Sequence, residues 1–202
     1  ISRGDWSSDV CSSDLALIHL YHQGEFLKIL EKEKQFASLY QDSIEMLNIF
    51  GSTNLALQNF KRAITNLNKA IKLNSNIPTI YYNLGLAYHH IGNMDDAILN
   101  YKKAIDIKPD YDEALNNMGM SLEEKGDIVG AIDKYNKVIA INPKHAGAYY
   151  NLGNSYQSTE NWSLAIDNYY RAIDIKPDYA EVYYNLGIVF SKKGNYEKSI
   201  SL

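Results

Sequence analysis

The apolar residues of segment 78–111 fall into two runs with helical spacing, and a short polar turn separates the two runs. The apolar positions on these two expected helices are Tyr81, Leu84, Tyr88, Ala97, Tyr101 and Ala104. Pro78 suits the first turn of the first helix, where a backbone N–H is not needed. Gly92 and Asn93 interrupt the pattern, and Pro109 ends the second helix. The segment is therefore expected to form a helical hairpin.

The same pattern recurs along the chain with a period of 34 residues. The small residues at this spacing are Gly85, Gly119, Gly153 and Gly187, together with Ala63, Ala97, Ala131 and Ala165. Prolines follow at Pro109, Pro143 and Pro177. An apolar position carries the register toward both ends of the chain at Phe26, Phe60, Met94, Ile128, Trp162 and Tyr196. Each period is expected to be one hairpin, in which the small residues let two helix backbones approach closely and tyrosines fill the adjoining space.

This pattern resembles the tetratricopeptide repeat family, whose motif places bulky, Leu-Gly, aromatic, small and proline positions at fixed offsets. One unit matches with Tyr81, Leu84, Gly85, Tyr88, Ala97, Tyr101, Ala104 and Pro109. The next matches with Leu115, Met118, Gly119, Leu122, Ala131, Tyr135, Val138 and Pro143. The third matches with Tyr149, Leu152, Gly153, Tyr156, Ala165, Tyr169, Ala172 and Pro177. The resemblance implies an all-α fold, a right-handed α-solenoid of stacked helix-turn-helix hairpins.

The expected units are three full repeats, 78–111, 112–145 and 146–179, with looser segments on either side. Residues 44–77 form a further repeat, although Asn54 stands where an aromatic residue is expected and Ser75 stands in place of the proline. Residues 15–43 are interpreted as a degenerate hairpin. Residues 180–202 open another repeat whose second helix does not finish, so we expect the sequence to be a fragment of a longer protein.

The first residues have a different character, because Asp5 to Leu15 can be back-translated into a common sequencing-adapter oligonucleotide. We therefore expect residues 1–14 to be a disordered, non-native segment fused to the reading frame. It contains Cys11, the only cysteine of the chain. One cysteine supports neither an internal disulfide nor a structural zinc site.

The candidate binding residues lie on the first helix of each hairpin, which the family resemblance places on the concave side. They are Asn83, Asn117, Asn151 and Asn185, with Tyr82, Tyr150 and Tyr184 beside them. An asparagine amide both donates and accepts hydrogen bonds, which matches one peptide unit of an extended chain. The arrangement is similar to the asparagine ladder in the repeat region of O-linked N-acetylglucosamine transferases. In the alternative interpretation, the asparagines bond to neighbouring hairpins or to water, and the tyrosines pack between repeats.

The charge of the chain narrows the class of ligand. The net charge is −4, which lacks the basic field typical of nucleic-acid binding. The expected concave positions carry Glu45, Glu113, Glu123, Glu124 and Glu181, with Lys192 as the strong base. We therefore expect a neutral or basic extended protein or peptide segment as partner, and neither nucleic acid nor a membrane.

The sequence gives only weak indications of catalytic or metal-binding sites. His19 and His22 are three residues apart on an expected helix and could share a metal, but no third ligand has a recognisable spacing, so a surface pair is favoured. Asp95-Asp96 and Glu123-Glu124 are interpreted as solvated faces and helix-start charges. No phosphate-binding loop, nucleophile elbow or metalloprotease motif is found, so no catalytic residue, metal or cofactor is expected.

Together these observations predict a non-catalytic, cytoplasmic protein–protein interaction scaffold that binds extended peptide segments. One alternative is the substrate-recruiting arm of a larger enzyme, similar to O-linked N-acetylglucosamine transferases or to repeat-bearing sulfotransferases and methyltransferases. Another is self-association through uncapped ends of the repeat array.

Overall fold

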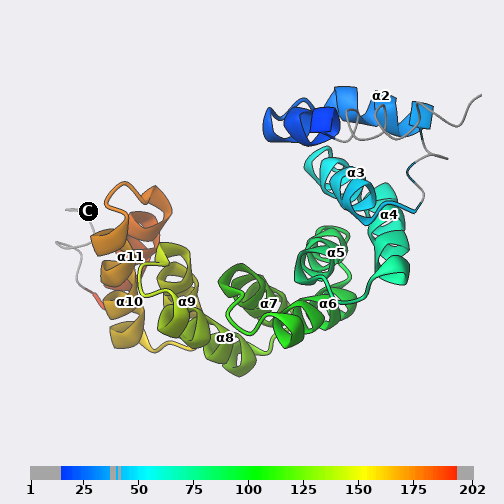
Figure 1. Ribbon diagram of the computed structural model, residues 1–202. Helices are drawn as coiled ribbons and strands as arrows, with labels where there is room; N and C mark the ends of the chain where they lie inside the picture. The colour runs from blue at the N-terminus through cyan, green and yellow to red at the C-terminus, as the bar shows by residue number, and fades with distance from the viewer. Residues whose placement is uncertain (1–14, 37–39, 41, 195–202) are drawn as a thin grey trace, which may run out of the picture. The chain divides into compact units, whose positions relative to one another are not determined.

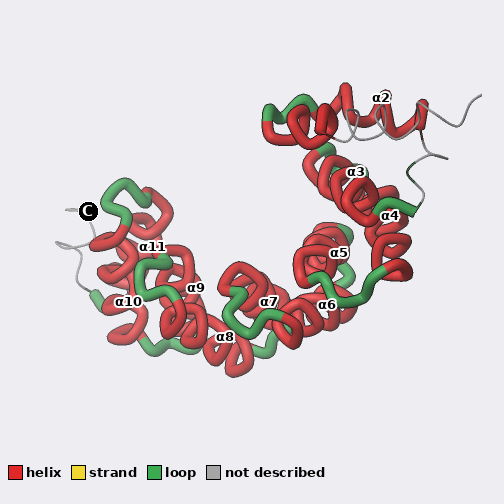
Figure 2. The backbone as a smooth tube through the Cα atoms, viewed as in Figure 1, coloured by secondary structure: helices red, strands yellow, loops and turns green. Residues whose placement is uncertain are grey.

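Figure 1 shows the computed structural model of the chain, which describes residues 15–36, 40 and 42–194. Within these residues every regular element is a helix, as Figure 2 shows. The all-α fold class expected from the sequence is therefore confirmed. The expected adapter-derived segment, 1–14, lies outside the described residues, as do residues 195–202 of the expected last repeat.

Residues 15–22 are helical, and α2 follows at Phe26–Phe36. From there two kinds of helix alternate. The first kind, which we call A helices, comprises α3 (Ile44–Ala56), α5 (Pro78–His90), α7 (Asp112–Glu124), α9 (Ala146–Ser158) and α11 (Ala180–Lys192). The second kind, the B helices, comprises α4 (Phe60–Leu73), α6 (Met94–Ile107), α8 (Ile128–Ile141) and α10 (Trp162–Ile175). The chain forms two compact units, Ile1–Lys108 and Pro109–Leu202.

The interior of each hairpin is built on a close approach between a glycine of the A helix and a tyrosine of the B helix. A Cβ atom added at Gly119 would lie 2.5 Å from Cε1 of Tyr135, and one added at Gly153 would lie 2.5 Å from Cε1 of Tyr169. Both tyrosine rings are fully buried, as is the small residue Ala131 that precedes Tyr135 by one helical turn. The expected role of the small residues in bringing two helices together is thus confirmed.

A left-handed backbone conformation recurs at the turn between A and B helices. It occurs with the period of the sequence at Gly24, Gln58, Gly92, Gly126, Glu160 and Gly194. Glycine adopts this conformation without steric cost, but Gln58 and Glu160 adopt it at a φ of 58° with a Cβ atom present. The turn geometry is therefore imposed by the hairpin and not by the residue that occupies this position.

We expect Glu160→Gly to raise the free energy of unfolding by about 0.5 to 1 kcal/mol, because relief of the left-handed strain exceeds the added chain entropy of glycine in the unfolded state. Chemical denaturation of both proteins measures the difference. Glu160→Ala is the matched control, since it removes the same carboxylate and keeps the Cβ atom. An equal gain from the alanine variant would show that backbone strain is not the source.

Candidate functional site

Three of the recurring asparagines, Asn83, Asn151 and Asn185, use their amide N–H groups to join one A helix to the preceding A helix of the same unit. In the first unit, Nδ2 of Asn83 donates to Oγ of Ser52 at 3.0 Å and to Oδ1 of Asn48 at 3.3 Å. In the second unit, Nδ2 of Asn151 donates to Oδ1 of Asn116 at 3.1 Å. These donors therefore bond to the neighbouring hairpin, as the alternative interpretation of the sequence anticipated.

Asn185 forms the same kind of link at the end of the second unit. Its Nδ2 donates to Oδ1 of Asn154 at 2.9 Å and to the hydroxyl of Tyr150 at 3.3 Å. Oδ1 of Asn154 also accepts a hydrogen bond from the hydroxyl of Tyr169, at 2.7 Å. Asn117 differs, since its Oδ1 accepts from Nδ2 of Asn116 at 3.4 Å.

Sequence reasoning missed the side chains that receive these bonds. They precede each recurring asparagine by 31 or 35 residues and comprise Asn48, Ser52, Asn116, Tyr150 and Asn154. Each of these separations differs from the repeat period by less than one helical turn. The paired side chains therefore lie on equivalent faces of successive A helices. Comparing polar residues at these two offsets would have found the contacts.

The carbonyl oxygens of the recurring asparagines have a different environment from their N–H groups. Among the described residues, no donor contacts Oδ1 of Asn83, Asn151 or Asn185. These side chains are half-buried, so the oxygens do not need an internal partner. Each of these side-chain amides is thus held in place by the hydrogen bonds of its N–H groups, and its Oδ1 atom can accept a further hydrogen bond.

The three candidate tyrosines lie in different surroundings. Tyr82 is half-buried, with its ring centroid 6.1 Å from that of Tyr101. Tyr150 is also half-buried, and its ring centroid lies 5.1 Å from that of Tyr179. Tyr184 is 73% exposed. Of the three, Tyr184 therefore offers most of its ring to a ligand.

Glu123 connects three helices of the second unit. Its Oε2 accepts a hydrogen bond from the hydroxyl of Tyr135 on α8 at 3.1 Å, and its Oε1 accepts from Oγ of Ser155 on α9 at 3.0 Å. Burial and the nearby Glu123 carboxylate both raise the pKa of Tyr135, because each disfavours the phenolate. The expectation that Glu123 belongs to a solvated face is wrong for this side chain.

The other charged residues expected on the concave side are open to solvent. Glu45, Glu113, Glu124 and Glu181 are exposed, and so is Lys192 in the last turn of α11. Asp95 and Asp96 lie in the first turn of α6, as expected for helix-start charges. Asn93 caps this helix, because its Oδ1 accepts from the N–H of Asp96 at 3.3 Å.

No group of three or more histidine, cysteine or acidic side chains that could hold a metal ion occurs in the part of the chain that the structure describes. His19 and His22 lie on the helix at residues 15–22. His90 stacks on Phe60, with ring centroids 5.0 Å apart. Within the same described residues, no helix has the length and apolar character required to cross a membrane.

Comparisons with known proteins agree with the helical repeat. A family model described as "TPR repeat" matches residues 51–92, 121–160 and 158–194, and a second, described as "Tetratricopeptide repeat", matches residues 78–111. No curated protein matches the chain.

Several solved structures are similar to this chain. A crystal structure of MamA is 30% identical, covers 75% of this chain and 88% of its own, and has a TM-score of 0.70. A MamA structure from Desulfovibrio magneticus is 22% identical over 78% of this chain and 89% of its own, with a TM-score of 0.73. YrrB, described as a TPR protein with an unusual peptide-binding site, is 20% identical over 87% of each chain, with a TM-score of 0.66.

Proposed function

Because the chain belongs to the tetratricopeptide repeat family, we propose that it is a non-catalytic protein-interaction scaffold whose A helices bind an extended peptide segment. The observation that carries the proposal is the fixed orientation of the recurring asparagines. Their N–H groups bond to the preceding A helix, and Oδ1 of Asn83, Asn151 and Asn185 accepts nothing from the described residues. A row of acceptors held in place suits the N–H groups of a peptide backbone.

The tyrosines supply the complementary contacts. Tyr184 exposes an aromatic ring and a hydroxyl that can donate to a peptide carbonyl, at low cost in side-chain entropy. The hydroxyl of Tyr150 accepts from Asn185 and keeps its own proton for a ligand. YrrB shares this fold and is described as having a peptide-binding site, which agrees with the proposal.

The exposed charges favour a neutral or basic segment. Glu113, Glu124 and Glu181 of the second unit are exposed, whereas Glu123 already accepts two hydrogen bonds. Lys192 is the exposed strong base of α11. An acidic peptide would be repelled by this surface, and a lysine or arginine side chain would be attracted to it.

The test uses a peptide selected on the immobilised chain from a display library of random sequences. We expect Asn151→Ala combined with Asn185→Ala to weaken binding of this peptide by roughly 1 to 3 kcal/mol, because two backbone hydrogen bonds are lost. Fluorescence polarisation of the labelled peptide gives the affinity of each variant.

The matched control is Asn168→Ala, which removes a half-buried asparagine of the B helix α10 that bonds to the carbonyl of Leu164. The Asn168→Ala variant should bind the selected peptide with the same affinity as the parent chain. Since Asn151 also bonds to Asn116, chemical denaturation must show that the double variant stays folded. A folded double variant with the parent affinity would refute the role of the asparagines.

A further inference from the structure

Glu123 is a carboxylate of the second unit that the described residues leave without a counter-ion. It is half-buried near the end of α7, where the hydroxyls of Tyr135 on α8 and Ser155 on α9 donate hydrogen bonds to it. Among residues 15–36, 40 and 42–194, no lysine, arginine or histidine side chain forms an ion pair with Glu123. Hydroxyl groups donate to a carboxylate but bring no positive charge to it.

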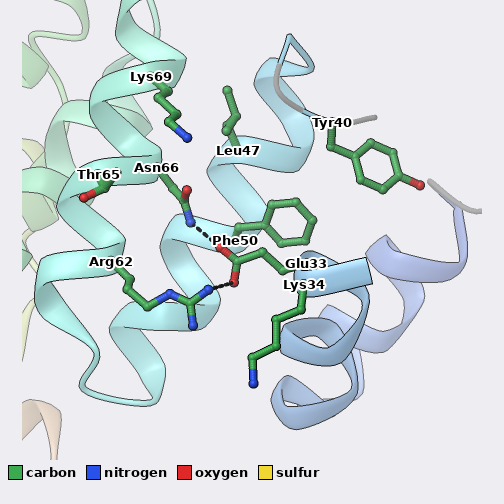
Figure 3. Close-up of a pocket in the computed structure, with 9 residues that line it drawn as sticks. All are labelled: Glu33, Lys34, Tyr40, Leu47, Phe50, Arg62, Thr65, Asn66 and Lys69. Carbon is green, nitrogen blue, oxygen red and sulfur yellow. Dashed lines mark hydrogen bonds and ion pairs between the residues drawn. The ribbon is translucent and has the colours of Figure 1, made fainter. Parts of the chain in front are cut away.

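The first unit contains a carboxylate for which a cation is present. Oε1 of Glu33 accepts a hydrogen bond from Nδ2 of Asn66 at 2.7 Å, and its Oε2 pairs with the guanidinium of Arg62 at 3.3 Å. Figure 3 shows both contacts, which reach from α4 to Glu33 on α2. Removal of a carboxylate from water is costly unless a cation balances its charge. Glu123 has neutral donors like those of Glu33, and the balancing cation is the part that the described residues do not supply.

The two hydrogen bonds fix the orientation of the Glu123 carboxylate and leave it able to accept more. Its Oε2 is held by α8 at 3.1 Å, and its Oε1 is held by α9 at 3.0 Å. The hydroxyl of Ser155 has one proton, which it shares between Glu123 and the carbonyl oxygen of Asn151 at 3.1 Å. A carboxylate offers about four lone-pair positions to donors. A cationic donor can therefore bind to Glu123 without displacing either hydroxyl.

The electrostatic field around Glu123 is negative. Burial raises the pKa of Tyr169 on α10, and the Glu123 carboxylate adds to this rise because it disfavours the phenolate. The next residue of α7, Glu124, is an exposed acid. A positively charged side chain is therefore attracted to this part of the second unit.

Glu123 lies beside an acceptor of the proposed peptide-binding surface. Asn151 and Ser155 are four residues apart on α9, so they lie on one face of that helix, about 6 Å apart along its axis. Ser155 bonds to Glu123, whereas Oδ1 of Asn151 is available to a peptide N–H. The four-carbon stem of a lysine spans a comparable distance. A peptide that bonds to Asn151 can thus extend a cationic side chain to Glu123.

The carboxylate at this position occurs on one A helix, whereas the asparagines recur. The equivalent residues of the other A helices are Leu55, His89, Gln157 and Ser191. A peptide backbone that bonds only to recurring asparagines can shift by one repeat without a change in its contacts. A single carboxylate distinguishes one of these registers from the others.

We propose that Glu123 anchors a lysine or arginine side chain of the bound peptide and thereby fixes the register of the peptide on the second unit. This inference rests on the proposed function, since it requires a peptide that lies along the A helices. It adds a requirement for a cationic residue at one position of the partner. The cation takes the role beside Glu123 that Arg62 has beside Glu33.

The experiment repeats the display selection on the parent chain and on two variants, Glu123→Gln and Glu124→Gln. Glutamine keeps the size of the side chain and removes its charge, and Glu124 is the exposed neighbour on the same helix. We expect lysine or arginine to be enriched at one fixed position of the peptides selected by the parent chain and by Glu124→Gln. Peptides selected by Glu123→Gln should lack this enrichment.

A binding cycle then measures the contact itself. The peptide selected on the parent chain is compared with a version in which uncharged norleucine replaces the cationic residue, and fluorescence polarisation gives both affinities. The replacement should weaken binding at least tenfold for the parent chain and for Glu124→Gln, but less than twofold for Glu123→Gln. Chemical denaturation must show that Glu123→Gln stays folded, since its side chain also contacts α8 and α9.

Three results would overturn the anchor. They are selected peptides without a shared cationic residue, a loss of less than twofold for the norleucine peptide on the parent chain, and equal effects of the two glutamine variants. The second result requires no variant, so it decides the question even if Glu123→Gln does not fold. In each case a weaker affinity of the Asn151→Ala, Asn185→Ala variant would still support the peptide-binding surface. If no peptide binds the parent chain, both proposals fail.

Discussion

Gly119→Leu is expected to lower the free energy of unfolding of the second unit by about 3 kcal/mol or more, because the new side chain has no space. An added Cβ atom alone would lie 2.5 Å from Cε1 and 3.0 Å from Cδ1 of Tyr135. The ring of Tyr135 is fully buried, so it cannot swing into solvent. Relief therefore requires α7 and α8 to move apart, which would expose the interior of the hairpin.

Urea denaturation of the variant and the parent chain measures this loss. Gly147→Ala is the control within an A helix, since its Cβ atom would meet only the side chain of His145 at 3.3 Å. Its effect should stay below about 1 kcal/mol, the range of glycine-to-alanine propensity differences in helices. A double-mutant cycle with Gly119→Ala and Tyr135→Ala should show that the two losses are less than additive. If Gly119→Leu unfolds at the parent's urea concentration, the assigned packing of α7 on α8 is wrong.

Glu33→Ala is expected to lower the free energy of unfolding by about 2 to 4 kcal/mol. This loss of stability should be concentrated at the start of the first unit. The carboxylate accepts hydrogen bonds from the amide groups of Asn54 and Asn66, both of which are buried. Nδ2 of Asn66 would lose its partner, whereas Nδ2 of Asn54 would keep its bond to the carbonyl of Phe50 at 2.8 Å. A buried donor left without a partner costs about 1 to 3 kcal/mol. Because these bonds connect α2 to α3 and α4, we expect α2 to detach before the other helices unfold.

Hydrogen exchange locates the effect of this substitution. Amides of α2 should lose protection in Glu33→Ala, whereas amides of α9 and α10 in the second unit should keep theirs. Glu31→Ala removes an exposed carboxylate from the same helix and serves as the control. Uniform loss of protection along the chain, or an equal loss from the control, would contradict the role assigned to Glu33.

The hairpins could be predicted from the sequence because local rules determine them. Pro78 stands at the first turn of α5, and Gly92 stands at a left-handed turn where the helical pattern was expected to break. The pairing of Gly119 with Tyr135 follows from the repeat register, since both positions recur with the period.

The contacts between hairpins could not be predicted in the same way. The partners of Asn151 and Asn185 depend on how far one A helix is shifted along the next, and apolar periodicity does not reveal that shift. The sequence places Glu123 on a solvated face because its helix is rich in polar residues. Its contacts with Tyr135 and Ser155 come from neighbouring helices, and are therefore a property of tertiary packing.

The hydrogen bonds that the side-chain amides form between A helices also affect how the array unfolds. They join one repeat to the preceding repeat, and among the described residues neither Asn83 nor Asn151 donates to the B helix of its own hairpin. In a one-dimensional stack, such bonds add to the coupling between neighbours and not to the intrinsic stability of a single repeat. Coupling of this kind determines how far an opening event spreads before it stops. The same asparagines would therefore influence both peptide capture and the cooperativity of each unit.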